Sequence, residues 1–297
     1  MRSTPRVAWL SRILIPLVLL LTQCQERPFE ERLIYFLHAQ QRAELDRLMR
    51  QHPGKVRDLL KERLNTWTDL EKTGASAQAQ AVLQDTRDLA KEFDRVAQDG
   101  FWKRVELRAA QPLSQRLAIR IVDAWVTKAA QAMDQRQNME ALDALDQAER
   151  ANQGPADPYM QAAIHHHRGL IAQNLYRYKE AQSQFERVQT IHTRIGNRVG
   201  LAAVQLDIGL LKKQMGRLSD ALQIYREALE EQQRILSLGD AAQTLNNLGN
   251  LCIQIGDLRQ GMAYLRKAVE QAEKISDDSR YSLALNNLGF AHSMQHE

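Results

Sequence analysis

The chain has 297 residues, of which 44% are hydrophobic and 26% charged, so its composition is that of a globular protein and excludes a disordered one. Without residues 1–24, which hold three arginines and no acid, 37 basic and 36 acidic residues remain, and this balance predicts no nucleic-acid binding. All seven prolines lie at or before Pro158, and the proline-free remainder is rich in Ala, Leu, Gln, Glu and Arg, which predicts helices rather than sheets.

Residues 1–24 have the pattern of a secretion signal. Arg2, Arg6 and Arg12 lead into the apolar run Ile13–Leu21, which is shorter than the ~20 residues that a membrane-spanning helix needs. The sequence Leu-Thr-Gln-Cys that ends at Cys24 resembles the lipobox of bacterial lipoproteins, although that family prefers a small residue where Gln23 stands. The resemblance implies export to the cell envelope and membrane contact through a lipid on Cys24. The alternative is an uncleaved N-terminal anchor.

Residues 25–121 are expected to be helical but do not follow the repeat described next. Amphipathic patterns predict helices over 29–49, 56–70 and 77–96, with glycines and prolines between them. Because the terminal units of repeat proteins need atypical faces, this region is interpreted as a helical cap at one end of a solenoid. A separate binding domain is the alternative, but no motif in this region supports it.

The rest of the chain contains a 40-residue repeat. Glycines recur at that spacing, and small and bulky residues follow them at constant offsets; the glycines are Gly169, Gly209, Gly249 and Gly289. Leu245–Gly249 and Leu285–Gly289 are the same five residues, Leu-Asn-Asn-Leu-Gly. In each unit the apolar spacing predicts two helices. The turns between helices are predicted at Gly216, at Gly256 and at Leu238-Gly239-Asp240, where the glycine would end one helix and Asp240 would cap the next.

This pattern resembles tetratricopeptide repeats in a longer form of about 40 residues, similar to those of kinesin light chain and of bacterial proteins with a CHAT protease domain. The implied fold is all-α, a right-handed superhelical solenoid of helix hairpins preceded by the N-terminal helical region. The repeats would cover residues 122–297, with units at about 122–161, 162–201, 202–241 and 242–281 and an incomplete unit at 282–297.

Small residues are expected where the two helices of a unit cross. Gly209 is predicted to pack against Ala221, and Gly249 against Gly261, because a larger side chain would hold the backbones apart. Cys252 lies on the apolar face of its helix and is interpreted as a small buried residue rather than a nucleophile.

No motif indicates catalysis, a metal or a cofactor. The chain lacks a Gly-rich phosphate loop, a Gly-x-Ser-x-Gly elbow and a Cys-x-x-Cys pair. The consecutive histidines 165–167 point about 100° apart on a helix, so they cannot converge on one ion. His165 is expected to face inward, and the other two to face a groove or solvent. The chain is therefore predicted not to be an enzyme.

Side-chain amides gather on one arc of two first helices. The arc comprises Gln243, Asn246, Asn247, Asn250, Gln254, Asn286 and Asn287. The family resemblance places this arc on a concave groove, where amides could donate to and accept from the backbone of a protein or peptide ligand. The alternative is a solvated polar face with occasional hydrogen bonds between helices.

These patterns together predict a non-catalytic scaffold of the bacterial cell envelope that holds a partner polypeptide. The alternative is the regulatory repeat region of an enzyme, such as a CHAT-type protease, whose catalytic domain is missing. It rests on the unit at 282–297, which has no second helix to cover its apolar residues.

Overall fold

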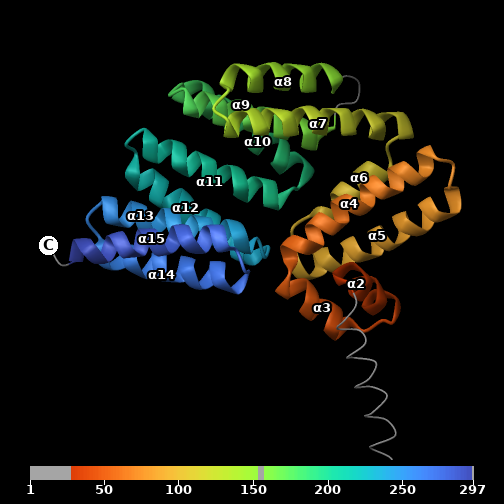
Figure 1. The fold of residues 1–297 in the computed structure, drawn as a ribbon, viewed down its shortest axis with the longest axis horizontal. Coiled ribbons are helices and arrows are strands. Elements are labelled where there is room, and N and C mark those ends of the chain that lie inside the picture. Colours follow the sequence, from red (N-terminus) through yellow and green to blue (C-terminus); the bar gives the residue numbers. More distant parts are fainter. Residues whose placement is uncertain (1–27, 153–156, 296–297) are drawn as a thin grey trace, which may run out of the picture.

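The structure, a computed structural model, describes residues 28–152 and 157–295, and Figure 1 shows their arrangement. This part of the chain folds into 14 α-helices, labelled α2 to α15, and contains no β-strand. The predicted signal segment and Cys24 lie outside the described residues. Among the helices that are described, none is both long and apolar enough to cross a membrane.

The first five helices form a unit with its own hydrophobic core, here called the N-terminal unit. They are α2 (Phe29–His38), α3 (Arg42–Gln51), α4 (Pro53–Lys72), α5 (Ser76–Ala97) and α6 (Phe101–Ala109). Leu33, Leu60 and Phe93 are fully buried in this core. The prediction of one helix over 29–49 is wrong, because Gln40 adopts a left-handed φ of 55° and separates α2 from α3.

The remaining helices pair into consecutive hairpins. They are α7 (Leu113–Asp134) with α8 (Asn138–Ala151), α9 (Pro158–Asn174) with α10 (Tyr178–Ile195), α11 (Arg198–Gln214) with α12 (Leu218–Arg234), and α13 (Leu238–Gln254) with α14 (Leu258–Lys274); α15 (Asp278–Gln295) follows. From α8 onward, a helix begins every 20 residues. The predicted 40-residue unit is therefore two helices of nearly equal length.

Left-handed backbone conformations mark the turns at the same spacing. Within the hairpins they occur at positions 136, 176, 216 and 256, and between hairpins at 196, 236 and 276. Glycine occupies 216 and 256, as predicted, and adopts this conformation without steric cost. The turn before α13 lies two residues earlier than predicted. Leu236, at φ 55°, lies in the turn after α12, and Ser237 Oγ donates to Asp240 Oδ2 at 2.6 Å across the first turn of α13.

The repeated glycines lie where the two helices of each hairpin touch. A Cβ at Gly209 would lie 2.5 Å from Tyr225 Cε1, so the nearest group is this ring rather than the predicted Ala221. Gly249 does pack against Gly261, since a Cβ on Gly261 would lie 2.8 Å from Gly249 O. The predicted burial of Cys252 is confirmed, with 0% of the residue exposed, and burial raises the pKa of its thiol.

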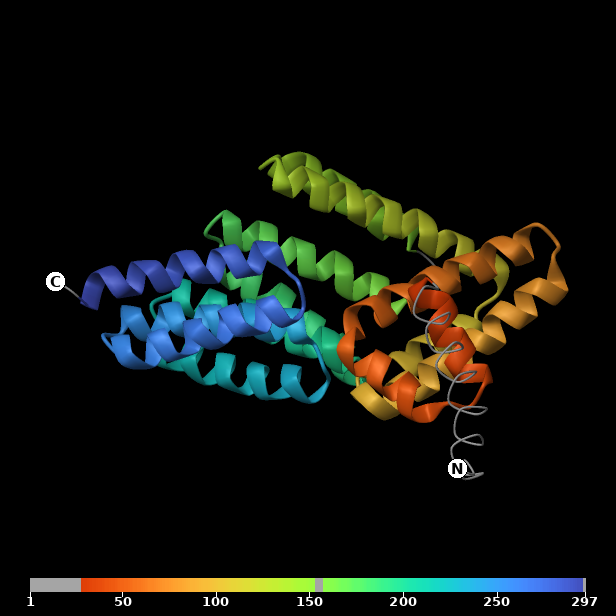
Figure 2. The ribbon, with the colours of Figure 1, turned by 60° about the horizontal axis from the view of Figure 1, so that its bottom comes forward.

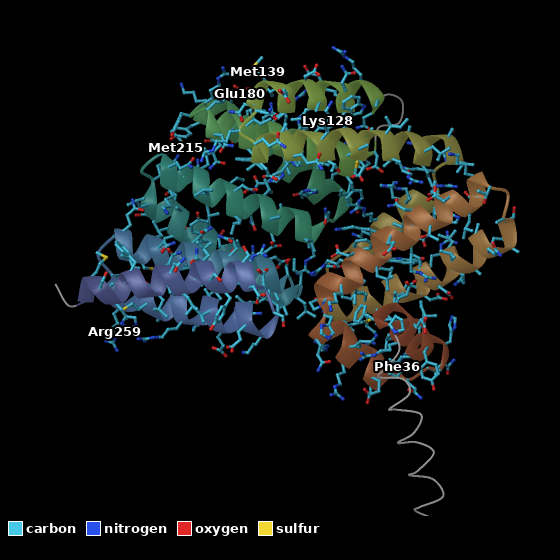
Figure 3. All side chains as sticks on the ribbon, in the orientation of Figure 1. Phe36, Lys128, Met139, Glu180, Met215 and Arg259 are labelled. Atoms are coloured by element: carbon cyan, nitrogen blue, oxygen red, sulfur yellow. The ribbon has the colours of Figure 1, made fainter. Side chains whose placement is uncertain are left out.

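The N-terminal unit runs along one edge of the solenoid, beside the turns that join successive hairpins (Figure 2). Arg108 Nη2 lies 3.9 Å from Asp157 Oδ2, in the turn before α9. Arg198 Nη1, at the start of α11, donates to Gln98 O at 2.7 Å. The turns within the hairpins lie along the edge that faces away from this unit, where Figure 3 labels Met139, Met215 and Arg259.

A buried arginine extends this contact to the turn before α13. Arg57 of α4 donates from Nε to Asp99 Oδ2 at 2.8 Å, and from Nη2 to Ile235 O at 2.6 Å. Its Nη1 donates to Leu236 O at 3.3 Å. The N-terminal unit therefore contacts three successive turns between hairpins, and its helix α4 also contacts α7.

Candidate functional site

The first helices of successive hairpins are joined by hydrogen bonds between residues 41 positions apart. The pairs are His166 Nε2 to Asp207 Oδ2 at 2.7 Å, Gln173 Nε2 to Gln214 Oε1 at 2.9 Å, and Asn287 Nδ2 to Asn246 Oδ1 at 2.7 Å. These bonds connect α9 with α11 and α13 with α15, so the first helices of these successive hairpins lie side by side. We call the surface that the first helices form together the first-helix face.

Two rows of side chains cross the first-helix face, each with one residue per helix at 40-residue spacing. The polar row is His167, Asp207, Asn247 and Asn287, and the second row is Leu170, Leu210, Asn250 and Phe290. Every member of both rows is at least partly exposed. Polar groups and apolar side chains therefore lie next to each other along a surface that spans four helices.

The structure divides the predicted amide arc into two groups. Asn246 is only 5% exposed and accepts from Asn287, so this pair joins two helices. The other members are accessible: Gln243, Asn247 and Asn250 are half-buried, and Gln254 and Asn286 are exposed. Gln243 Nε2 donates to Asn247 Oδ1 at 3.3 Å, and the side chain of Asn250 makes no hydrogen bond with another described residue. The second group therefore has amide atoms that are accessible at the surface.

The sequence analysis missed the members of this face that come from α9 and α11. Leu170, Leu210 and the pair of His166 with Asp207 occupy positions equivalent to those of the predicted amides. The 40-residue register would have identified them, since it assigns each first-helix position a counterpart in the neighbouring unit. The search for amides alone overlooked them because the residue types differ between units.

The three consecutive histidines point to three different partners, as their positions on a helix predict. His165 Nδ1 donates to Gln184 Oε1 of α10 at 2.8 Å, which directs it toward the hairpin partner helix. His167 Nδ1 donates to the carbonyl oxygen of Ala163, one turn earlier in α9, at 2.8 Å. Among the described residues, no group of three or more His, Cys, Asp or Glu side chains could hold a metal ion.

A fourth histidine is held neutral beneath the start of α11. The Nδ1 atom of His192 accepts from Asn197 Nδ2 at 3.1 Å, and Asn197 Oδ1 accepts from Gly200 N at the first turn of α11. Burial, together with the smaller effect of the nearby charges of His166 and Arg104, lowers the pKa of His192 to about 4. An unprotonated Nδ1 is required for this arrangement, because a protonated one could not accept.

We expect His192 to make the fold sensitive to mild acid. Because its pKa in the folded chain lies below the ordinary value of 6.5, the unfolded chain takes up a proton first as the pH falls. The contribution of His192 to the free energy of unfolding should therefore be intact above pH 6.5 and decrease toward pH 4. Thermal unfolding measured by circular dichroism between these values should show His192→Gln with a shallower pH dependence than the wild type. The exposed His292→Gln serves as the control, and an unchanged slope in His192→Gln would contradict this assignment.

Family comparisons identify tetratricopeptide repeats in two segments, residues 160–232 and 242–275. This repeat is generally a non-catalytic scaffold for protein interactions, and both matches are to this one kind of repeat. No curated protein sequence matches the chain significantly.

Several solved structures share the fold at low sequence identity. A Rap protein in complex with Competence and Sporulation Factor is 14% identical, with a TM-score of 0.54 over 80% of this chain and 72% of the other. Aspartyl phosphate phosphatase F from Bacillus subtilis is 13% identical, with a TM-score of 0.54 over 89% and 78% of the two chains. The apo form of RapI is 16% identical, with a TM-score of 0.51 over 59% of this chain and 64% of its own length. The predicted fold class, a right-handed superhelical solenoid of tetratricopeptide hairpins, is confirmed.

Proposed function

We propose that the chain is a non-catalytic scaffold that holds a partner polypeptide on its first-helix face. The observation that carries the proposal is the accessible amide pair Asn247 and Asn250 of α13. The pair lies on the first-helix face together with Leu210 of α11 and Phe290 of α15. The fold supports it, since tetratricopeptide repeats are interaction modules, and a structure with a TM-score of 0.54 to this one is a complex of a Rap protein with Competence and Sporulation Factor.

The two rows provide complementary chemistry for an extended chain. A side-chain amide carries both a donor and an acceptor, so Asn247 and Asn250 can bond the N–H and C=O groups of a bound backbone. Leu210 and Phe290 offer apolar surface on either side of them for alternate side chains of the ligand. The hydrogen bonds to the ligand backbone provide affinity that depends little on the ligand's sequence, and the apolar contacts with its side chains provide selectivity.

Replacing Asn247 and Asn250 together by Ala should weaken partner binding without destabilising the fold. Each lost hydrogen bond to a bound backbone costs ~0.5–1.5 kcal/mol, so the double variant should bind about tenfold more weakly. The melting temperature should stay close to that of the wild type, because Ala is the better helix former. A photoreactive residue introduced at position 250 in intact cells would capture the partner, and its affinity for the purified wild-type chain and double variant can then be measured.

The hydrogen-bonded pair of the buried Asn246 and the half-buried Asn287 provides the contrasting variant. Replacing both by Ala removes the hydrogen bond between α13 and α15, so it should lower stability while the accessible amides remain. If the Asn247 and Asn250 variant binds the captured partner as tightly as the wild type does, the first-helix face is not the binding surface.

We further propose that the scaffold works in the cell envelope, attached through a lipid on Cys24. The basic residues, the short apolar run and the cysteine of residues 1–24 support this location. Metabolic labelling with palmitate should mark the wild-type protein, and Cys24→Ala should abolish the label because the acceptor thiol is gone. Label retained by Cys24→Ala would contradict the lipoprotein assignment, whereas Cys252→Ala should label like the wild type.

A further inference from the structure

A small cavity lies where the N-terminal unit meets the first hairpin and α9. It has a volume of about 90 Å³ and is lined by residues of α4, α6, α7 and α9; Figure 1 shows α4 and α6 next to the start of α7. Its walls include the almost fully buried side chains of Leu64, Ile119 and Met160. Because these walls are apolar, charges in the cavity interact more strongly than they would in water. The volume corresponds to about three water molecules, so the cavity has room for one small polyatomic group.

Basic side chains outnumber acidic ones around this cavity. The charged residues that line it are Lys61 of α4, Arg104 and Arg108 of α6, and Arg120 and Asp123 of α7. Two of the cations already have carboxylate partners, since Lys61 Nζ lies 3.3 Å from Asp58 Oδ1 and Arg120 pairs with Asp69. The one carboxylate in the lining, that of Asp123, belongs to an exposed residue at the rim. The two arginines of α6 are therefore the cations that a ligand would meet inside the cavity.

Arg108 is a buried cation that makes no hydrogen bond with another described residue. Only 9% of its side chain is exposed, and Asp157 Oδ2 lies 3.9 Å from its Nη2, which is beyond hydrogen-bond range. The other oxygen of this carboxylate, Oδ1, accepts from Tyr159 N at 2.9 Å and from Met160 N at 3.1 Å, at the first turn of α9. Burial lowers the pKa of Arg108 even though Asp157 opposes this effect, so the charge of the guanidinium is only partly compensated.

Arg104 lies one helical turn before Arg108 and also has an unused donor. Its guanidinium lies over the ring of Tyr159, with the central carbon 4.7 Å from the ring centroid, and this contact favours one position of the side chain. Its Nε atom is buried and donates no hydrogen bond to another described residue. Residues four positions apart lie on the same face of a helix, so two guanidinium groups with free donors line one cavity. Guanidinium groups bind carboxylate and phosphate oxygens through paired N–H groups.

We propose that this cavity is a binding site for one phosphate-sized oxyanion, held by Arg104 and Arg108 with Lys61 at the rim. The anion supplies the hydrogen-bond acceptors that the two guanidinium groups lack, and its charge offsets theirs. A dianion suits the site better than a single carboxylate, because two guanidinium groups face it. Inorganic phosphate and a phosphoryl group on a polypeptide present the same oxygens, and the experiment below separates these two sources. The site shares no residue with the amide pair of the first-helix face and is independent of the proposed function.

Isothermal titration of the full chain with sodium phosphate tests the site directly, with sodium chloride keeping the ionic strength constant. We expect saturable binding of one phosphate per chain. Arg108→Gln should weaken it at least about tenfold, because the variant loses a charge-assisted hydrogen bond in an apolar surrounding. Arg187→Gln removes the same charge from the exposed side of α10 and should bind phosphate like the wild type.

Two exposed rim residues give variants that do not alter a buried side chain. Lys61→Gln should weaken phosphate binding a few-fold, because it removes a cation from the rim. Asp123→Asn should strengthen binding a few-fold, because it removes a charge that repels the anion. A purely structural role for these side chains would not produce opposite changes in affinity. Circular dichroism melting curves verify that Arg108→Gln is folded at the temperature of the titration.

A pentapeptide with a central phosphoserine, compared with its unphosphorylated form, separates the two sources. Competition between the phosphopeptide and phosphate would support a phosphorylated polypeptide as the ligand, and phosphate binding without competition would support the free ion. Asn247→Ala with Asn250→Ala should bind phosphate like the wild type, so the result does not depend on the first-helix face. Equal phosphate binding by the wild type and Arg108→Gln would overturn the proposal, as would the absence of saturable binding with both probes.

Discussion

Replacing Gly209 by Leu is expected to lower the free energy of unfolding by ~1–3 kcal/mol, the usual cost of forcing extra atoms into a packed core. The new Cβ alone would lie 2.5 Å from Tyr225 Cε1 and 2.7 Å from Cδ1. The ring cannot move away easily, since Tyr225 is fully buried between α11 and its neighbours. The crossing of α11 and α12 must therefore widen, and this disturbs the contacts of both helices with the adjacent hairpins.

The chain contains its own control for this substitution. Gly289 has the same place in its helix, 80 residues later, but has no atom within 4 Å of an added Cβ. Gly289→Leu should leave stability unchanged or raise it slightly, because Gly is a poor helix former. Urea unfolding followed by circular dichroism would compare the two. Equal shifts of the unfolding midpoint would show that the glycine position does not mark the helix crossing.

The 40-residue register made the hairpins predictable from the sequence, because each turn and each helix face recurs at constant offsets. It could not predict which residue covers each glycine. The ring of Tyr225 lies one helical turn beyond Ala221, and the choice between them depends on the angle at which the helices cross, which the spacing does not specify. The break between α2 and α3 at Gln40 could not be predicted either, since a polar residue inside an amphipathic pattern does not indicate a left-handed conformation.

The candidate site was predictable only in part. The amides of α13 and α15 stand out by residue type, but whether an amide bonds a neighbouring helix or stays accessible depends on the distance between helices. Asn246 and Asn250 look alike in the sequence, and the structure buries the first against Asn287 while it leaves the second half-exposed. The local sequence pattern therefore does not predict which of the two side chains is buried.

The contact of the N-terminal unit with the repeats had no signal in the sequence. Arg57 and Ile235 are 178 positions apart, and neither belongs to a periodic pattern that would pair them. Yet this contact joins the two parts of the fold, since the guanidinium of Arg57 lies between the carboxylate of Asp99 and the carbonyl groups of Ile235 and Leu236 in the turn that follows α12. Both charged side chains are buried, with Asp99 only 1% exposed.

Arg57→Met is expected to cost ~3–5 kcal/mol of stability, the range found when one partner of a buried ion pair is removed. The loss arises because the carboxylate of Asp99 would remain buried without its counter-charge, and because Ile235 O would lose its donor. Lys61→Met, in the same helix, removes an exposed pair with Asp58 and should cost no more than ~1 kcal/mol. Urea unfolding of the two variants provides the comparison.

The double variant with Asp99→Asn distinguishes the charge from the packing. Asn keeps an acceptor for Phe101 N, which donates to Asp99 Oδ1 at 2.9 Å, but carries no buried charge. If the uncompensated carboxylate is the main cost, Arg57→Met with Asp99→Asn should be more stable than Arg57→Met alone. If the double variant is as unstable as the sum of the two single changes, the loss of the bonds to Ile235 O and Leu236 O is the main cost. The arginine would then act chiefly as the link between the N-terminal unit and the turn before α13.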